Sequence, residues 1–137
     1  MTMVTITVHE DCGNAPKKLF LKDFLVAAVS NDSAFVARNT TDDIRWNLVG
    51  GRCISGKQDV LPELQRSRSD EVAELIIKTI ITHGYHGAAD GFLKFKDGKM
   101  VAFCDVYQFR ASTNHAPIKA ITTYAIALAE REATSQP

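Results

Sequence analysis

The chain has 137 residues, of which 45% are hydrophobic and 23% are charged, as expected for a globular protein. Its 16 basic and 16 acidic side chains balance, and the lack of a basic excess argues against a nucleic-acid partner. No apolar run approaches the roughly 18 residues that span a membrane, and the first residues lack the pattern of a signal peptide. The three cysteines form no CxxC pair and predict no disulfide framework, so a reduced, cytoplasmic protein is expected.

The length predicts one domain over residues 1–137, with its helices gathered in the first half. Residues 1–14 form a lead-in, in which the alternating segment 3–8 fits a short edge strand or an extended chain. Pro16 suits the first turn of a helix, where its missing N–H would have no partner in any case. An apolar face at helical spacing then predicts a helix to about Asn31.

Two shorter helices flank a strand in the next part of the chain. Ser33 is the predicted N-cap of the first, and residues 57–66 predict the second. Between them, residues 43–49 predict a strand, in which alternation puts Trp46 and Asn47 on opposite faces.

The second half of the chain predicts four long antiparallel strands. Residues 71–83 form the first; a helix is the alternative, but the crowding of β-branched residues favours a strand. Two more strands make a hairpin over residues 88–109, joined at Asp97-Gly98, where a type I′ turn is expected. The last strand covers residues 118–128, and residues 129–137 form a polar tail that is expected to fray. Helices followed by strands indicate an α+β fold, with a twisted sheet that curls around the first helix.

Four short motifs stand in a particular order along the chain. They are Trp46-Asn47-Leu48-Val49-Gly50-Gly51, Ile54-Ser55-Gly56-Lys57, Asp97-Gly98-Lys99-Met100-Val101 and Phe103-Cys104-Asp105-Val106-Tyr107. Their order and spacing resemble the nuclear transport factor 2-like superfamily, and within it the polyketide-cyclase-like (SnoaL-like) branch. The resemblance covers roughly residues 15–130.

The resemblance implies a cone-shaped α+β barrel of the cystatin-like type, in which a curved mixed or antiparallel sheet wraps around the long N-terminal helix. In this superfamily the open end of the cone usually holds a mainly apolar pocket, and homodimers through the outer face of the sheet are common. Members include isomerases, cyclases, dehydratases and epoxide hydrolases, and also non-catalytic carriers and association domains. The resemblance therefore implies a homodimer, and it leaves the activity open. We expect the ligand to be an apolar, oxygenated small molecule and expect no cofactor.

One position departs from the ketosteroid-isomerase branch of the superfamily. That branch places a catalytic aspartate in the strand before the Gly-Lys helix start, and here Asn47 takes that position. A neutral amide has no basicity for proton abstraction, and alternation also puts Asn47 on the face opposite Trp46. The isomerase mechanism of that branch is therefore not expected.

Asp105 and His83 are the candidate catalytic residues. On strict alternation Asp105 shares a face with Phe103 and Tyr107. An apolar face of this kind disfavours the charged form of the carboxylate and raises its pKa toward the range useful for general acid–base catalysis. The alternative is a structural carboxylate, bonded to a neighbouring strand or across a dimer interface. His83 ends a long strand near the expected mouth of the barrel, where an imidazole suits acid–base chemistry; a structural histidine is the alternative.

Five residues are candidates for contact with a ligand. Trp46 is the only tryptophan; it could stack on a flat ligand, or it is a core residue. Phe103 is a candidate because it shares a strand face with Asp105. Tyr107 and Tyr124 could donate hydrogen bonds to a ligand oxygen, or pack with their hydroxyls at a rim. His86 is the fifth candidate, with a loop histidine as the alternative. No third ligand stands at recognisable spacing from the two histidines, so no metal site is predicted.

Two functions of different classes follow from these residues. The first is a small enzyme that uses Asp105, with His83, for proton transfer on an apolar substrate; cyclisation, isomerisation and water addition all fit. The second is a non-catalytic ligand-binding or dimerisation domain of the same fold, in which both side chains have structural partners and no open pocket remains. A macromolecular partner on the exposed face of the sheet is a third alternative.

Overall fold

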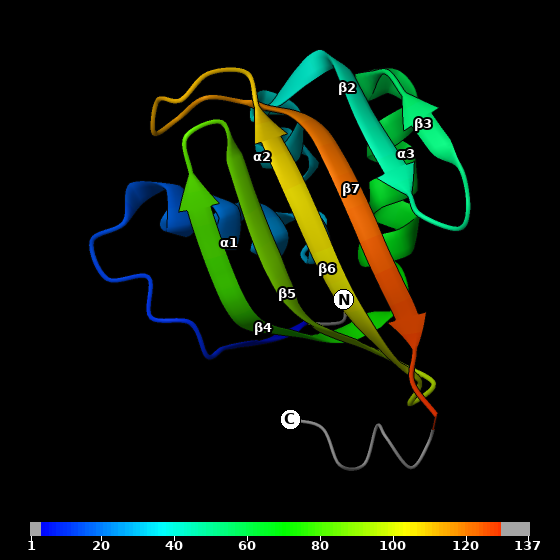
Figure 1. Cartoon of the computed structure of the whole chain (residues 1–137). Helices are drawn as coiled ribbons and strands as arrows, with labels where there is room; N and C mark the ends of the chain where they lie inside the picture. The colour runs from blue at the N-terminus through cyan, green and yellow to red at the C-terminus, as the bar shows by residue number, and fades with distance from the viewer. Residues whose placement is uncertain (1–3, 130–137) are drawn as a thin grey trace.

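The computed structural model describes residues 4–129, so the predicted tail lies outside the described residues from residue 130 onward. Figure 1 shows an α+β architecture, and the predicted fold class is confirmed. None of the helices in the described range is long and apolar enough to cross a membrane. Within residues 4–129 the elements are, in chain order, β1 (Thr5–Val8), α1 (Pro16–Val29), α2 (Ser33–Arg38), β2 (Thr40–Leu48), β3 (Cys53–Ser55), α3 (Lys57–Arg68), β4 (Val72–His83), β5 (His86–Phe95), β6 (Met100–Phe109) and β7 (Ile118–Ala127).

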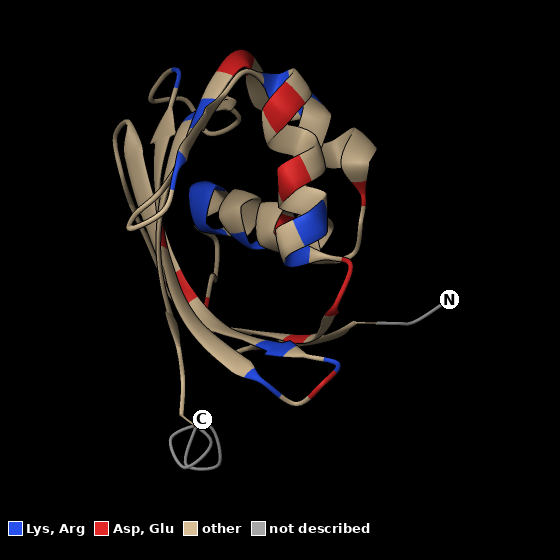
Figure 2. Ribbon diagram, turned by 90° about the vertical axis from the view of Figure 1, so that its right-hand side faces the viewer, with Lys and Arg blue, Asp and Glu red and all other residues tan. Residues whose placement is uncertain are grey.

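The strands form one mixed sheet in the order β1-β4-β5-β6-β7-β2-β3. The long strands β4 to β7 pair antiparallel with one another, as the sequence predicts. β1 pairs parallel with β4, and β2 pairs parallel with β7, so both edges of the sheet come from the first half of the chain. Figure 2 shows the sheet curved around the helices, which lie on its concave face. We call the opposite side of the sheet, which no helix of residues 4–129 covers, the outer face.

The first helix supplies the centre of the core. α1 begins at Pro16, as predicted, and turns Leu21, Phe24 and Leu25 toward the sheet, each of them 2% exposed or less. From the sheet, Tyr107 meets Phe24 edge-on, with ring centroids 6.2 Å apart. Burying side chains of this kind contributes roughly 1.5–3 kcal/mol each. This packing fixes where the inward-facing side chains of β6 lie.

The predicted hairpin between β5 and β6 is present, but its turn is not type I′. Gly98 has a φ of +91°, whereas Asp97 has a negative φ, and a type I′ turn needs positive φ at both central residues. The amide of Gly98 donates to the carbonyl of Phe95 over 2.9 Å, and the amide of Phe95 donates to the carbonyl of Lys99 over 2.8 Å. The loop therefore has an extra residue, and Gly98 is the left-handed residue of a bulge.

Three boundaries also differ from the sequence prediction. The N-cap of α2 is Asp32 rather than Ser33, and its carboxylate accepts a hydrogen bond from the amide of Phe35 over 3.2 Å. β2 begins earlier, at Thr40, because it pairs there with β7. α3 continues to Arg68, whose side chain is buried.

A β-bulge in β4 brings backbone atoms close to Gly91 of β5. The register between these strands shifts between Ile77 and Thr79. A Cβ atom on Gly91 would lie 1.8 Å from the carbonyl oxygen of Ile76. The close approach of two backbones therefore requires glycine at this position.

Candidate functional site

Asp105 lies on the concave side of the sheet, on the same face as Phe103 and Tyr107, as alternation predicts, and it is 1% exposed. Its Oδ1 accepts hydrogen bonds from Arg68 Nη2 over 2.8 Å and from Thr123 Oγ1 over 2.6 Å. Its Oδ2 accepts from Arg68 Nη1 over 3.0 Å and from Tyr107 Oη over 2.9 Å. An ionised carboxylate offers about four lone-pair sites, so these donors fill its acceptor capacity.

Trp46 completes a buried cluster around this carboxylate. Its indole Nε1 donates to Thr123 Oγ1 over 2.8 Å. The Arg68 guanidinium lies over two aromatic rings, 5.2 Å from the centroid of Phe103 and 5.8 Å from that of Trp46. Strands β2, β6 and β7 and helix α3 each contribute to the cluster. We call it the Asp105 cluster, and its members, each 5% exposed or less, are Trp46, Arg68, Asp105, Tyr107 and Thr123.

The ion pair of Arg68 and Asp105 is fully buried. Removing two charges from water costs several kcal/mol per ion, which only good geometry and additional hydrogen bonds offset. Burial, followed by the charge of Asp105, raises the pKa of Tyr107 well above its ordinary value. Burial by itself would lower the pKa of Arg68, but the charge of Asp105 and the hydrogen bonds to it outweigh burial and raise that pKa. Tyr107 and Arg68 therefore keep their protons and remain donors to the carboxylate.

The structure does not bring Asp105 and His83 together. Ile77 faces the core, and regular alternation from there would turn His83 inward as well, but the bulge that follows Ile77 reverses the faces. His83 therefore lies exposed on the outer face, paired with His86. Tyr124, another predicted ligand contact, is also on the outer face and is 51% exposed. The remaining predicted contacts belong to the surroundings of Asp105. Tyr107 bonds to its carboxylate, Trp46 bonds to Thr123, and Phe103 packs against the Arg68 guanidinium.

Arg68 and Thr123 are the members of the cluster that the sequence did not single out. Val60, Leu64 and Arg68 follow one another at four-residue spacing, so they share the buried face of α3. Thr123 shares the inward face of β7 with Ile121 by strand alternation. Both periodicities are readable from the sequence, but a helix that ends at residue 66, as predicted, leaves Arg68 outside it.

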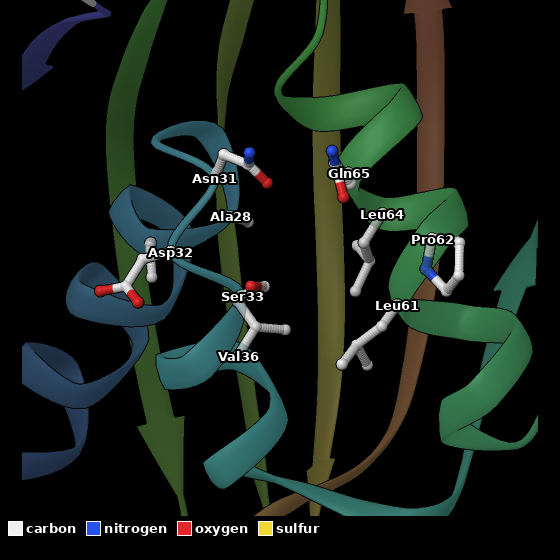
Figure 3. A pocket seen from close by; sticks show the side chains of 10 residues that line it. Ala28, Asn31, Asp32, Ser33, Val36, Leu61, Pro62, Leu64 and Gln65 are labelled. Carbon is white, nitrogen blue, oxygen red and sulfur yellow. The ribbon is translucent and has the colours of Figure 1, made fainter.

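A separate hollow of about 180 Å³ has α3 on one side. On its other side lie the C-terminal end of α1 and the helix α2, as Figure 3 shows. Val36, Leu61 and Leu64 give it apolar walls, and the side-chain amides of Asn31 and Gln65 lie at one end of it. None of the predicted site residues lines this hollow. We call it the helical cleft, and its lining residues are Ala27, Ala28, Asn31, Asp32, Ser33, Val36, Leu61, Pro62, Leu64 and Gln65.

Comparison with known proteins gives similarity to solved structures only. No protein-family model matches the chain, and no curated protein matches it either. The crystal structure of an NTF-2 like protein of unknown function from Burkholderia xenovorans aligns with a TM-score of 0.71 at 14% sequence identity, covering 88% of this chain and 90% of the other. This chain has the nuclear transport factor 2-like fold. The resemblance found in the sequence is therefore confirmed at the level of the fold.

Two further structures agree with this nuclear transport factor 2-like fold. An NTF2-like protein of unknown function from Cytophaga hutchinsonii aligns with a TM-score of 0.59 at 26% identity, covering 80% of this chain and 99% of the other. A SnoaL-like protein from Shewanella denitrificans aligns with a TM-score of 0.65 at 14% identity, covering 89% of this chain and 96% of the other. Likeness at these identities establishes the architecture of the domain and leaves its activity open.

The outer face of this nuclear transport factor 2-like domain carries exposed apolar side chains. Ile81 and Val106 both lie opposite Ala88 in the strand register. Tyr124 and Ile126 follow each other on the same face of β7. Contiguous exposed apolar patches mark interaction sites. Asp90 of β5 also faces outward, and its Oδ1 is buried without a hydrogen bond from any residue of the described range. We call the exposed apolar residues the outer-face strip; they are Ile81, Val106, Tyr124 and Ile126, with exposed fractions of 61%, 38%, 51% and 68%.

Proposed function

We propose that this protein is a non-catalytic binding domain that works as a homodimer through the outer face of its sheet. The outer-face strip is the observation that carries the proposal, because it leaves large apolar side chains in water. Each Å² of apolar surface that a partner covers contributes roughly 25 cal/mol. A second copy presents the same strip, and a two-fold axis brings the same patch of both copies into contact.

The interior supports a non-catalytic role. A general base needs a lone pair that it can direct at a substrate proton. The donors from Arg68, Thr123 and Tyr107 occupy the acceptor sites of Asp105. His83, the other candidate for proton transfer, lies on the opposite face of the sheet. Catalysis by this pair stays a prediction, which turnover by an Asp105→Asn variant would test.

Asp90 supports a second copy as the partner on this face. A buried acceptor that lacks a donor costs about 1–3 kcal/mol. Tyr124 carries a half-exposed phenol on the same face, two strands away in the order of the sheet. In a two-fold interface, the phenol of the partner's Tyr124 can donate to Asp90 while the reciprocal bond forms on the other side of the axis.

Changing Ile126 to glutamate is expected to convert a dimer into a monomer, because it places a charge in an apolar interface at the most exposed residue of the outer-face strip. Light scattering coupled to gel filtration should give twice the chain mass of 15.1 kDa for the natural protein and 15.1 kDa for Ile126→Glu. Leu19→Glu is the matched control, since Leu19 is also an exposed apolar residue but lies on α1. A natural protein that stays monomeric at high concentration would overturn the proposal.

A second candidate function is the binding of a small, apolar, oxygenated molecule in the helical cleft. The cleft is smaller than the roughly 300 Å³ at the lower limit of usual ligand pockets, so it suits a compact ligand. Its walls are apolar, and the amides of Asn31 and Gln65 are donors suited to one ligand oxygen. This arrangement fits the small-molecule class that the sequence suggests, in a different place from the predicted one.

Ser33→Phe is expected to block the helical cleft, because Ser33 lines it from the start of α2. Titration of the natural protein with p-cresol, a ring that carries one hydroxyl, should shift amide NMR signals of residues along the cleft. Those shifts should vanish in Ser33→Phe and persist in Ala34→Phe, whose side chain starts from the neighbouring exposed position outside the cleft. Equal shifts in both variants would show that the ring binds elsewhere.

A further inference from the structure

The connection between β4 and β5 places two histidines side by side. β4 ends at His83 and β5 begins at His86, so only Gly84 and Tyr85 lie between them. His83 and His86 are direct partners in the antiparallel register. Directly opposite residues of an antiparallel pair project from the same face, with Cβ atoms about 4.5–5.5 Å apart. Both imidazoles therefore leave the outer face next to each other.

The two-residue loop that joins His83 to His86 is fixed by hydrogen bonds from two other parts of the chain. Gly84 adopts a φ of +57°, which suits a tight connection. The ammonium of Lys17 donates to the carbonyl of Gly84, and the amide of Phe109 donates to the carbonyl of Tyr85 over 2.8 Å. A hairpin fixed in this way keeps two side chains at a constant separation, which is what a chelating pair requires.

Both imidazoles are free to bind. Each residue is exposed, and neither ring takes part in a hydrogen bond or an ion pair with any other residue of the range 4–129. They line a shallow hollow of about 200 Å³ together with Ala88 and two residues of the outer-face strip, Ile81 and Val106. A second copy seated on the strip would therefore lie beside the two imidazoles. No charged side chain lines the hollow, so nothing there repels a cation.

We propose that His83 and His86 form a two-imidazole site for a borderline divalent metal ion such as Ni²⁺, Cu²⁺ or Zn²⁺. Imidazole nitrogen suits these ions, whereas Mg²⁺ and Ca²⁺ prefer oxygen ligands. The described residues hold no group of three or more His, Cys, Asp or Glu side chains arranged for a metal. The site therefore offers two protein ligands, and water completes the coordination. The spacing of the two residues alone does not reveal this pair, because the bulge in β4 and the strand register decide which face the rings share.

Calorimetric titration of the untagged protein with Ni²⁺ tests the site. The natural chain should bind one ion, and His83→Ala and His86→Ala should each lower the affinity by about tenfold or more. Both residues are exposed, so the circular dichroism spectra of these variants should stay unchanged. His115→Ala is the matched control, because His115 is also exposed but lies in the loop after β6.

A second measurement separates chelation from diffuse surface binding. With Cu²⁺ added, electron paramagnetic resonance should show coupling to two imidazole nitrogens in the natural protein and to one in either alanine variant. The proposal fails if the natural chain binds Ni²⁺ no more tightly than His83→Ala does. It also fails if His115→Ala weakens binding as much as the other two changes.

Discussion

Replacing Arg68 by alanine is expected to lower the free energy of unfolding by about 3–5 kcal/mol, because it leaves the buried Asp105 carboxylate without its counter-charge. Arg68 is 5% exposed and Asp105 is 1% exposed, so water cannot take the place of the guanidinium without opening the core. Urea unfolding followed by circular dichroism measures the loss. Arg66→Ala is the matched control on the same helix, since Arg66 pairs with Glu63 at the surface and should change stability little.

The double variant Arg68→Leu with Asp105→Leu sharpens this test. If the cost of Arg68→Ala comes from the unpaired carboxylate, removing both charges should restore part of the lost stability, since apolar replacements of buried pairs are often tolerated. Two losses that simply add would instead indicate that the residues act independently. Unchanged stability in Arg68→Ala would contradict the buried ion pair itself.

Replacing Gly91 by alanine is expected to destabilise the fold by about 3 kcal/mol or more, at the upper end of what overpacking costs. The added methyl would lie 1.8 Å from the carbonyl oxygen and 2.9 Å from the carbonyl carbon of Ile76, and these backbone atoms cannot rotate away. β4 and β5 would have to separate at the bulge. Thermal unfolding measures the effect as a fall in melting temperature.

Gly51→Ala is the control for this substitution. A Cβ atom on Gly51 meets Leu48 at 3.4 Å, and Gly51 has no positive φ, so alanine should be tolerated there. A Gly91→Ala protein as stable as Gly51→Ala would mean that the two strands do not approach as closely as described.

The elements that the sequence predicts well are those set by local properties. The helix from Pro16, the long strand that ends at His83 and the hairpin strands all follow from periodicity and turn residues. The inward direction of Asp105 also follows, because β6 alternates without interruption up to Gln108. The order of the elements, together with four short sequence motifs, indicates the family of folds.

The features that the sequence does not predict depend on contacts between distant residues. The partners of Asp105 include Arg68, 37 residues away, and Thr123, 18 residues away, and no local pattern pairs them. The direction of His83 depends on a single extra residue in β4, and one such residue moves a side chain to the other face. The predicted turn type at Asp97-Gly98 is wrong for a local reason, because Asp-Gly fits both the two-residue loop and the longer bulged loop.

The position of β7 sets the order in which this chain can complete its structure during synthesis. Among the strands of residues 4–129, β7 is made last, yet it lies between β6 and β2 and joins the two parts of the sheet. Trp46 and Thr123, which bond across this seam, are 77 residues apart. Pairings over such separations form slowly, because a long loop must close before they contribute. A nascent chain that stops before β7 would hold its helices and the β4–β6 meander but expose two unpaired strand edges, which are sites of aggregation.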